Sequence, residues 1–558
     1  MALAEVEAKN LVVDTARFFA LLRMTPINIK LVEHFAVSNS FSVGPMLIFI
    51  GEPGTLTSSL FSDLYNKKVI LHLNRLKQSP IGYRLAKGTF WSFVGTLIVR
   101  VLSMLSSIIV ARMLGKAGFG QFGIVQVTLG MFGTLAGLGL GLTATKYVSE
   151  FRTTNRVKAG RIIALSEMVS LLSGLVMAGV LFAFAPWIAA RTLADPHLAG
   201  ALKLGSVFLL FTTLTTAQDG TLAGFEAFKV IAERNLTAGI ITFPLMLFLV
   251  HSKGLVGGLW ALIIGTVINW ILNYHAIHKE CAKADIKLQF SNLREEIPIL
   301  WLFSFPAALS SILMTPLTWA ANTTLAKCTN GYAEMGIYNA ANQWRAVIMF
   351  VPAMIMQASL PILSQCHGRD EREHFAKTTA ANQAVMMLIG IPGGCLLMFL
   401  SEYIMSLYGH GFSGRSDVLI ITLAGVMVSC MGAATGPAIQ AKGMMWLGCA
   451  INFSYGLVMF LIAYFTVSAM GAEGLAMAST VSYVVITLWA FQVLKNDVPR
   501  CVYVRAYTSI LLMALLLCGA FITPVGFRPM LAVPACLISY YITRKYLIGK
   551  QVYDGTGY

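Results

Sequence analysis

Residues 88–123 read GTFWSFVGTLIVRVLSMLSSIIVARMLGKAGFGQFG, and this stretch decides the class of the chain. Its apolar run exceeds the ~20 residues that cross a bilayer as a helix, and a short glycine-rich turn follows. One arginine, Arg100, lies near the middle of the run. A charge inside an apolar span is costly, so Arg100 is a candidate functional residue by default.

The composition is typical of a polytopic membrane protein. Of the 558 residues, 57% are hydrophobic and 12% are charged, whereas soluble proteins carry roughly 25% charged residues. The net charge of +16 arises largely in short loops between apolar runs. This pattern indicates membrane topology and contact with anionic lipid headgroups, and no nucleic-acid partner is expected.

Motifs for nucleotides, metals and disulfides are missing from the sequence. There is no P-loop motif, and the nine cysteines form no CxxC pair. Gly118, Gly120 and Gly123 spell GxGxxG, but a dinucleotide fingerprint requires a preceding strand and this one follows an apolar helix. We therefore expect no cofactor and no metal.

Fourteen apolar runs are long enough to be membrane helices, and none alternates as a β-barrel strand would. They are residues 89–114, 119–143, 161–186, 203–224, 234–251, 254–277, 297–324, 334–362, 380–407, 416–439, 443–466, 473–494, 504–523 and 528–547. The sequence thus predicts an all-α polytopic membrane protein with about 14 transmembrane helices.

Lysine and arginine are distributed unequally between the two sides of this topology. With the N-terminus inside, the cytoplasmic loops carry 21 of these residues and the outer loops carry 8. This excess predicts that both termini are cytoplasmic. Arg100 and Arg345 fall in neither set, because both lie deep inside predicted spans.

A faint internal repeat predicts the domain organisation. The first span is followed by GQF at 120–122, and the seventh is followed by GIY at 336–338. Six helices separate the copies, so the halves share one orientation, and a substrate site is expected between them at mid-depth. The expected parts are a cytoplasmic extension (1–87), an N-lobe of helices 1–6 (88–277), a cytoplasmic linker (278–296), a C-lobe of helices 7–12 (297–494), and helices 13 and 14 with the tail (495–558).

Three stretches resemble a known family. Residues 91–123 resemble the first helix and turn of polysaccharide-biosynthesis flippases, the Wzx-type O-antigen translocases of the MOP superfamily. This superfamily also holds the lipid II flippase and the MATE drug exporters. The stretches ATKYVSE at 144–150 and GIYNAANQWR at 336–345, the latter leading to LPILS at 360–364, are similar to the same family. The resemblance covers about residues 85–495.

The resemblance implies a V-shaped pair of six-helix lobes in the bacterial inner membrane. Such proteins are not enzymes. They move an undecaprenyl-pyrophosphate-linked oligosaccharide, an O-antigen or exopolysaccharide unit, between leaflets by alternating access. In the lipid II flippase, cavity arginines are associated with the diphosphate, and one has the R-V-L context that Arg100 has here. A second arginine of that protein is replaced by Ser106-Ser107, which argues for a glycan other than lipid II.

The substrate-binding candidates are basic and polar residues inside or at the end of spans. Arginine offers planar bidentate donors to phosphate, so Arg100 is expected to bind the diphosphate; the alternative is a structural arginine paired with an acid or a helix end. Arg345 borders a polar face of the eighth span, which should look inward; its alternative is interhelix hydrogen bonding. The remaining candidates are Asn339, Asn342 and Gln343 on that face and Lys146, which either attracts the headgroup or anchors the second span.

Two acids are candidates for ion coupling. Glu167 and Asp219 lie in or near the membrane, where desolvation favours protonation of a carboxylate. Coupling to H⁺ or to Na⁺ is open, and so is the alternative of ion pairs with basic residues of neighbouring helices. Membrane lipids and the lipid-linked oligosaccharide are expected partners, and proteins of polysaccharide assembly are candidate partners.

Three other functions compete with the flippase. A MATE-like cation-coupled drug antiporter needs an acid-lined cavity, whereas the first span carries Arg100 and no acid. A membrane glycosyltransferase or polymerase would be expected to have a large outer loop or an acidic catalytic motif, and every predicted outer loop is short. A scaffold without transport activity would not need a buried arginine.

Overall fold

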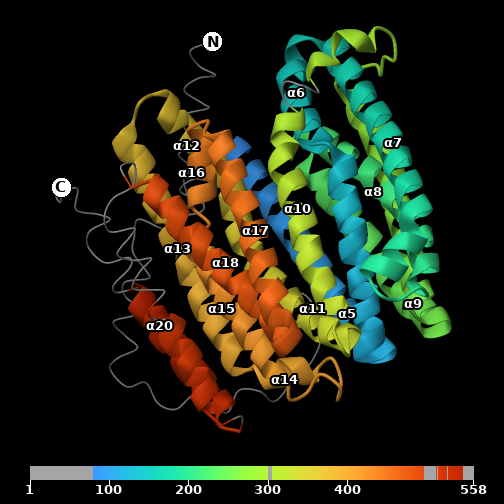
Figure 1. Ribbon diagram of the computed structural model, residues 1–558. Coiled ribbons are helices and arrows are strands. Elements are labelled where there is room, and N and C mark those ends of the chain that lie inside the picture. The colour runs from blue at the N-terminus through green and yellow to red at the C-terminus, as the bar shows by residue number, and fades with distance from the viewer. Residues whose placement is uncertain (1–79, 300–303, 496–510, 512, 525, 545–558) are drawn as a thin grey trace, which may run out of the picture. The chain divides into compact units, whose positions relative to one another are not determined.

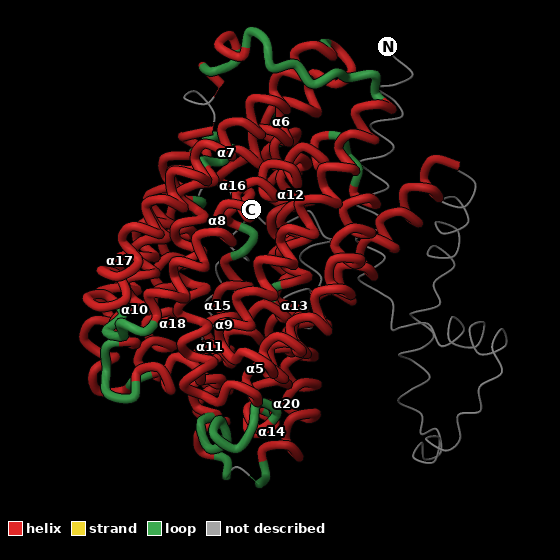
Figure 2. Tube along the Cα trace, turned by 90° about the vertical axis from the view of Figure 1, so that its right-hand side faces the viewer, coloured by secondary structure: helices red, strands yellow, loops and turns green. Residues whose placement is uncertain are grey.

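The computed structural model describes residues 80–299, 304–495, 511, 513–524 and 526–544, and over these ranges it is helical without strands (Figures 1 and 2). Among the described helices, eight are long and apolar enough to cross a membrane. The predicted all-α multi-pass membrane protein is confirmed, and the count of about 14 spans stays a prediction. The predicted cytoplasmic extension up to residue 79 and the tail from residue 545 lie outside the described residues.

The chain divides into two units, and the second begins at Val94. The contacts described below lie within the second unit. We call α5–α9 of this unit the first half and α10–α18 the second half. The predicted six-helix lobes stay a prediction.

The first half follows the first six predicted spans. It comprises α5 (Pro80–Gly137), α6 (Leu140–Thr154), α7 (Arg156–Trp187), the π-helix η1 (Ile188–Thr192), α8 (Leu198–Gly224) and α9 (Phe228–Lys283). Two of these helices each cover two predicted spans and turn sharply between them, α5 at Gly115 (φ 68°) and α9 at Gly254 (φ 57°). Both turns fall on glycine because positive φ strains other residues. The short 3₁₀ helix η2 (Leu293–Glu295) follows in the linker.

The second half and the C-terminal helix follow the later spans. The helices are α10 (Phe305–Ala326), α11 (Gly331–Ile348), α12 (Phe350–Gly368), α13 (Arg372–Phe399), α14 (Ser401–Ser406), α15 (Ser416–Gly432), α16 (Thr435–Ala441), α17 (Met445–Met470), α18 (Ala472–Val493) and α20 (Arg528–Ile542).

In the described part of the chain, four spans that the sequence predicts as continuous are interrupted, the second at Leu138–Gly139, the ninth at Leu400, and two others shortly before a proline. The eighth breaks at Met349, between α11 and α12, and the tenth breaks next to Ala433, between α15 and α16. A proline follows each of these last two breaks by three or four residues, Pro352 and Pro437. Proline lacks the N–H that would bond to the carbonyl four residues earlier, and its ring crowds that carbonyl. These two breaks therefore have the same local cause.

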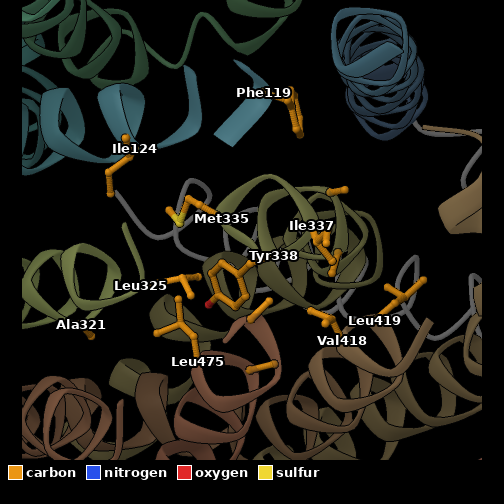
Figure 3. Packing of buried hydrophobic residues seen from close by; sticks show 14 of the residues in the cluster. Phe119, Ile124, Ala321, Leu325, Met335, Ile337, Tyr338, Val418, Leu419 and Leu475 are labelled. Carbon is orange, nitrogen blue, oxygen red and sulfur yellow. The ribbon is translucent and has the colours of Figure 1, made fainter. Parts of the chain in front are cut away.

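Helix packing separates the two halves except at a shared core. Helices α6–α9 pack on one another, α10–α18 pack on one another, and α20 packs on α13 (Figure 1). One large apolar cluster contains residues of both halves. Figure 3 shows Phe119 and Ile124 of α5 in this cluster together with Met335, Ile337 and Tyr338 of α11. The part of α5 after the Gly115 turn therefore connects the first half to the second.

Candidate functional site

Arg100 of α5 reaches from the first half to the second. Its side chain is half-buried, and Nη2 donates a hydrogen bond of 3.0 Å to the carbonyl oxygen of Ala346. Ala346 lies in the last turn of α11, where carbonyls lack partners within the helix. The carboxyl end of a helix also carries partial negative charge, which favours a cation. The structure therefore pairs Arg100 with a helix end, and its predicted role with a diphosphate stays a prediction.

A cavity of about 430 Å³ lies beside this contact. This volume falls in the ~300–1,000 Å³ range of small-molecule sites. Its polar lining includes Ser103, Ser106 and Ser107 of α5, Asn235 and Asn269 of α9, and Gln343 of α11. Residues three or four apart share a helix face, so Arg100 is adjacent to Ser103, and Ala346 is adjacent to Gln343. The Arg100–Ala346 hydrogen bond therefore lies at the edge of the cavity.

Arg345 is directed into the second half. Its Nη2 donates a hydrogen bond to the hydroxyl of Tyr483 on α18, and its guanidinium carbon lies 5.0 Å from the centroid of the same ring. The ring of Tyr455 on α17 packs 4.9 Å from that of Tyr483. These contacts match the alternative of interhelix hydrogen bonding, and Arg345 is not among the described residues that line the cavity.

The polar face of α11 is only partly directed to the cavity. Gln343 lines it. Asn339 packs instead on Gly123 of α5, where an added Cβ would lie 1.6 Å from the Asn339 amide nitrogen. Asn342 is half-buried on the same helix. The expected substrate contacts of Asn339 and Asn342 stay predictions.

The two candidate coupling acids lie in different surroundings. Asp219 on α8 accepts hydrogen bonds from Arg234 (3.3 Å) and from the amide of Asn273 (3.0 Å), both on α9. This is an ion pair with a basic residue of a neighbouring helix, the alternative to ion coupling. Glu167 on α7 has a buried carboxylate oxygen, Oε1, without a hydrogen-bond partner. Coupling by either acid stays a prediction.

Lys146 is exposed on α6, and its ammonium lies 4.8 Å from the ring centroid of Tyr147. The proposed contact with an entering headgroup stays a prediction. Lys146, Glu167 and Asp219 are not among the described residues lining the cavity. The structure thus brings Arg100 and Gln343 together at one site and leaves the other candidates apart from it.

Sequence reasoning missed most of the cavity lining. Asn235 and Asn269 lie inside apolar spans, where an amide is expensive unless it has a partner or a functional role. That signal would have been sufficient to select them. The serines at 103, 106 and 107 carry a weaker signal, because serine is common where membrane helices pack closely.

A second set of contacts joins the two halves around the Gly115 turn. The hydroxyl of Tyr332 donates to the Leu193 carbonyl at 2.6 Å, and Arg112 Nε donates to the Leu407 carbonyl at 2.6 Å. The ring of Phe119 lies 6.3 Å from those of Tyr408 and Phe412. By the predicted topology these contacts lie on the outer side.

A similar solved structure defines the class of fold. The chain aligns with the structure "Lipid II flippase MurJ, inward closed conformation" at a TM-score of 0.64 and 15% identity, over 81% of this chain and 97% of that one. At this identity the likeness establishes the fold alone, which is that of MOP-superfamily transporters. The sequence profile of the polysaccharide biosynthesis protein family matches residues 85–367, just over half of the chain, and the chain belongs to this family. The MatE profile matches residues 306–438.

Curated relatives support the same assignment. The chain is 21% identical over 403 residues to the "EPS I polysaccharide export inner membrane protein EpsE" of Ralstonia nicotianae, covering 70% of this chain and 89% of the relative. It is 20% identical over 409 residues to a "Putative O-antigen transporter" of Shigella flexneri, covering 72% and 96%. The family expected from the sequence is therefore confirmed, and these relatives are transporters rather than enzymes.

Proposed function

We propose that this protein is a flippase that moves an undecaprenyl-pyrophosphate-linked oligosaccharide across the bacterial inner membrane by alternating access. The observation that carries the proposal is the position of Arg100, which is at the edge of a polar cavity and on the boundary between the halves. The names of the polysaccharide export and O-antigen relatives support a lipid-linked saccharide as the substrate class.

In this mechanism, the diphosphate replaces the Ala346 carbonyl as the partner of Arg100. A diphosphate carries at least two negative charges and accepts two parallel hydrogen bonds from a guanidinium. It therefore outcompetes a single neutral carbonyl. The glycan occupies the adjacent cavity while the lipid tail stays in the bilayer, and no covalent bond is made or broken. Exchange of partners at Arg100 loosens the contact between α5 and α11 as substrate binds.

Re-orientation would require the contacts around the Gly115 turn to open. Those contacts include two single hydrogen bonds, an aromatic cluster and the close approach of Gly120 to Gly336. Each is small enough to separate without unfolding a helix. We propose that their separation exposes the headgroup on the outer side, and that H⁺ or Na⁺ coupling through Glu167 drives the cycle.

The rival drug antiporter would be expected to place an acid in the cavity to attract a cation. The described lining contains neither Asp nor Glu. Arg100 at its edge favours an anionic ligand instead.

A leaflet assay tests the proposal. Lipid-linked oligosaccharide reaching the outer leaflet is measured in cells that lack the protein and are complemented with wild type, Arg100→Ala, or Arg156→Ala as the matched control. Arg156 is an exposed surface arginine paired with Asp285. We expect loss of export in the null strain and with Arg100→Ala, and full export with Arg156→Ala. Unchanged export in the null strain would refute the flippase, and unchanged export with Arg100→Ala would remove Arg100 from the mechanism.

A further inference from the structure

The polar groups that line the cavity beside Arg100 are uncharged. Among the described residues that line it, none is Asp, Glu, Lys, Arg or His. Its polar groups are hydroxyls, such as those of Ser103 and Ser107, and amides, such as those of Asn235 and Asn269. Hydroxyls and amides both donate and accept hydrogen bonds. This is the chemistry that complements sugar hydroxyl and acetamido groups.

Two lining atoms have no partner within the protein. Ser107 Oγ on α5 and Asn269 Oδ1 on α9 are buried and make no hydrogen bond in the structure. Such orphan atoms are rare because leaving them unpaired is costly. They come from two different walls of the cavity. A hydroxyl-rich ligand between α5 and α9 would offer a partner to each after a small rearrangement of the lining, because neither atom is solvent-accessible here.

Aromatic rings complete the lining. Phe122 of α5 and Phe243 of α9 contribute to the same cavity. The apolar C–H face of a sugar ring packs on an aromatic face, while its rim of hydroxyls reaches the polar side chains. Small-molecule sites commonly combine an apolar wall with a few oriented polar groups.

We propose that this cavity binds the sugars next to the diphosphate and selects an uncharged glycan, rich in hydroxyl and acetamido groups, over one that carries a carboxylate there. The inference rests on the proposed function and adds the substrate class. A buried carboxylate is strongly disfavoured unless a cation pairs with it, and the described lining supplies none. Arg100 borders the cavity but is occupied by the diphosphate.

Ligand binding to the full-length protein in lipid nanodiscs is measured by native mass spectrometry. This experiment distinguishes failure of the glycan selectivity from failure of the proposed flippase function. Three probes are compared: undecaprenyl diphosphate without sugar, the same lipid carrying a neutral N-acetylhexosamine disaccharide, and the same lipid carrying a disaccharide with a uronic acid. We expect the neutral probe to bind at least about tenfold more tightly than the acidic probe, a difference of ~1.4 kcal/mol. Equal or tighter binding of the acidic probe overturns the selectivity alone. If none of the three binds, the proposed function fails as well.

Variants locate the selectivity in this cavity. Asn269→Ala and Ser107→Ala are expected to weaken the neutral probe several-fold and to leave the bare lipid unchanged. Thr237→Val is the matched control, because Thr237 is exposed on α9 and its hydroxyl bonds within its own helix. Ser103 is exposed, so Ser103→Lys should fold, and it is expected to shift the preference towards the acidic probe. An unchanged preference in Ser103→Lys, or equal weakening of all three probes by Asn269→Ala, contradicts a sugar site here.

Discussion

Gly120 of α5 and Gly336 of α11 face each other where the two halves cross. A Cβ added to Gly120 would lie 1.8 Å from the Tyr332 carbonyl oxygen, and one added to Gly336 would lie 2.0 Å from the Lys116 carbonyl oxygen. These glycines begin the GQF and GIY tripeptides of the faint sequence repeat. Equivalent positions of the repeat therefore lie next to each other at this crossing.

Alanine at either glycine should separate the crossing helices. For Gly120→Ala we expect a loss of about 1–3 kcal/mol of stability, because inserted atoms in a packed core force the backbone to move. Thermal unfolding of the purified protein measures the loss. Gly130→Ala is the control, since Gly130 lies on the same helix, is exposed and has open space around its Cβ position. Equal melting temperatures for the two variants would show that the crossing tolerates a methyl group.

Lysine at position 100 should preserve charge but not function. Arg100→Lys lacks the planar fork that grips two phosphate oxygens. We expect its initial rate of translocation in proteoliposomes to fall roughly tenfold, equivalent to about 1.4 kcal/mol. Arg156→Lys, the same change at an exposed surface position, should transport at the wild-type rate. Full activity of Arg100→Lys would mean that a point charge suffices at this site.

Removing the hydroxyl of Tyr483 should lower the stability of the second half. In Tyr483→Phe the ring under the Arg345 guanidinium is kept, but the hydroxyl that accepts from Arg345 is lost. Loss of this bond to a half-buried guanidinium that also hydrogen-bonds with Tyr455 costs about 1 kcal/mol. Tyr464→Phe on α17, where the tyrosine is 63% exposed, serves as the control. If both variants melt at the same temperature, the Arg345–Tyr483 hydrogen bond contributes nothing.

Thr128→Val tests a hydrogen bond between the halves. Trp319 Nε1 of α10 donates to the Thr128 hydroxyl at 3.0 Å, and Thr128 is fully buried on α5. Valine has a similar shape but no acceptor, so the indole N–H loses its partner at a cost of about 1–3 kcal/mol. Thr134→Val on the same helix is the control. Both hydroxyls donate to the carbonyl four residues earlier, but that of Thr134 is exposed and has no partner in the other half among the described contacts. A melting temperature equal to that of Thr134→Val would contradict the interhalf bond.

Hydropathy was sufficient to predict an all-helical multi-pass membrane protein. The boundaries between the first and second spans and between the fifth and sixth fall at Gly115 and Gly254, as a glycine turn requires. The breaks at Met349 and Ala433 were not predicted, although Pro352 and Pro437 are visible in the sequence. A proline in a membrane helix either kinks or interrupts it, and neighbouring helices decide which.

The site was less accessible to sequence reasoning. The cost of a buried charge selected Arg100, but its partner is a backbone carbonyl, which has no sequence signature. The same rule selected Arg345, whose direction depends on Tyr483 about 140 residues away. Periodicity placed Asn339 and Gln343 on one face, yet Gly123 leaves room for Asn339 to pack against α5, outside the described cavity lining. Side-chain direction therefore depended on long-range packing.

The hydrogen bond between Arg100 and Ala346 also affects the return step of the transport cycle, in which no substrate is bound. A carrier must return empty, and a bare guanidinium would make that return expensive in a membrane. The carboxyl end of α11 takes the place of the ligand, because the Ala346 carbonyl accepts a hydrogen bond from Arg100 when no substrate is bound. In the proposed mechanism the empty protein can therefore return without leaving an unpaired charge in the membrane.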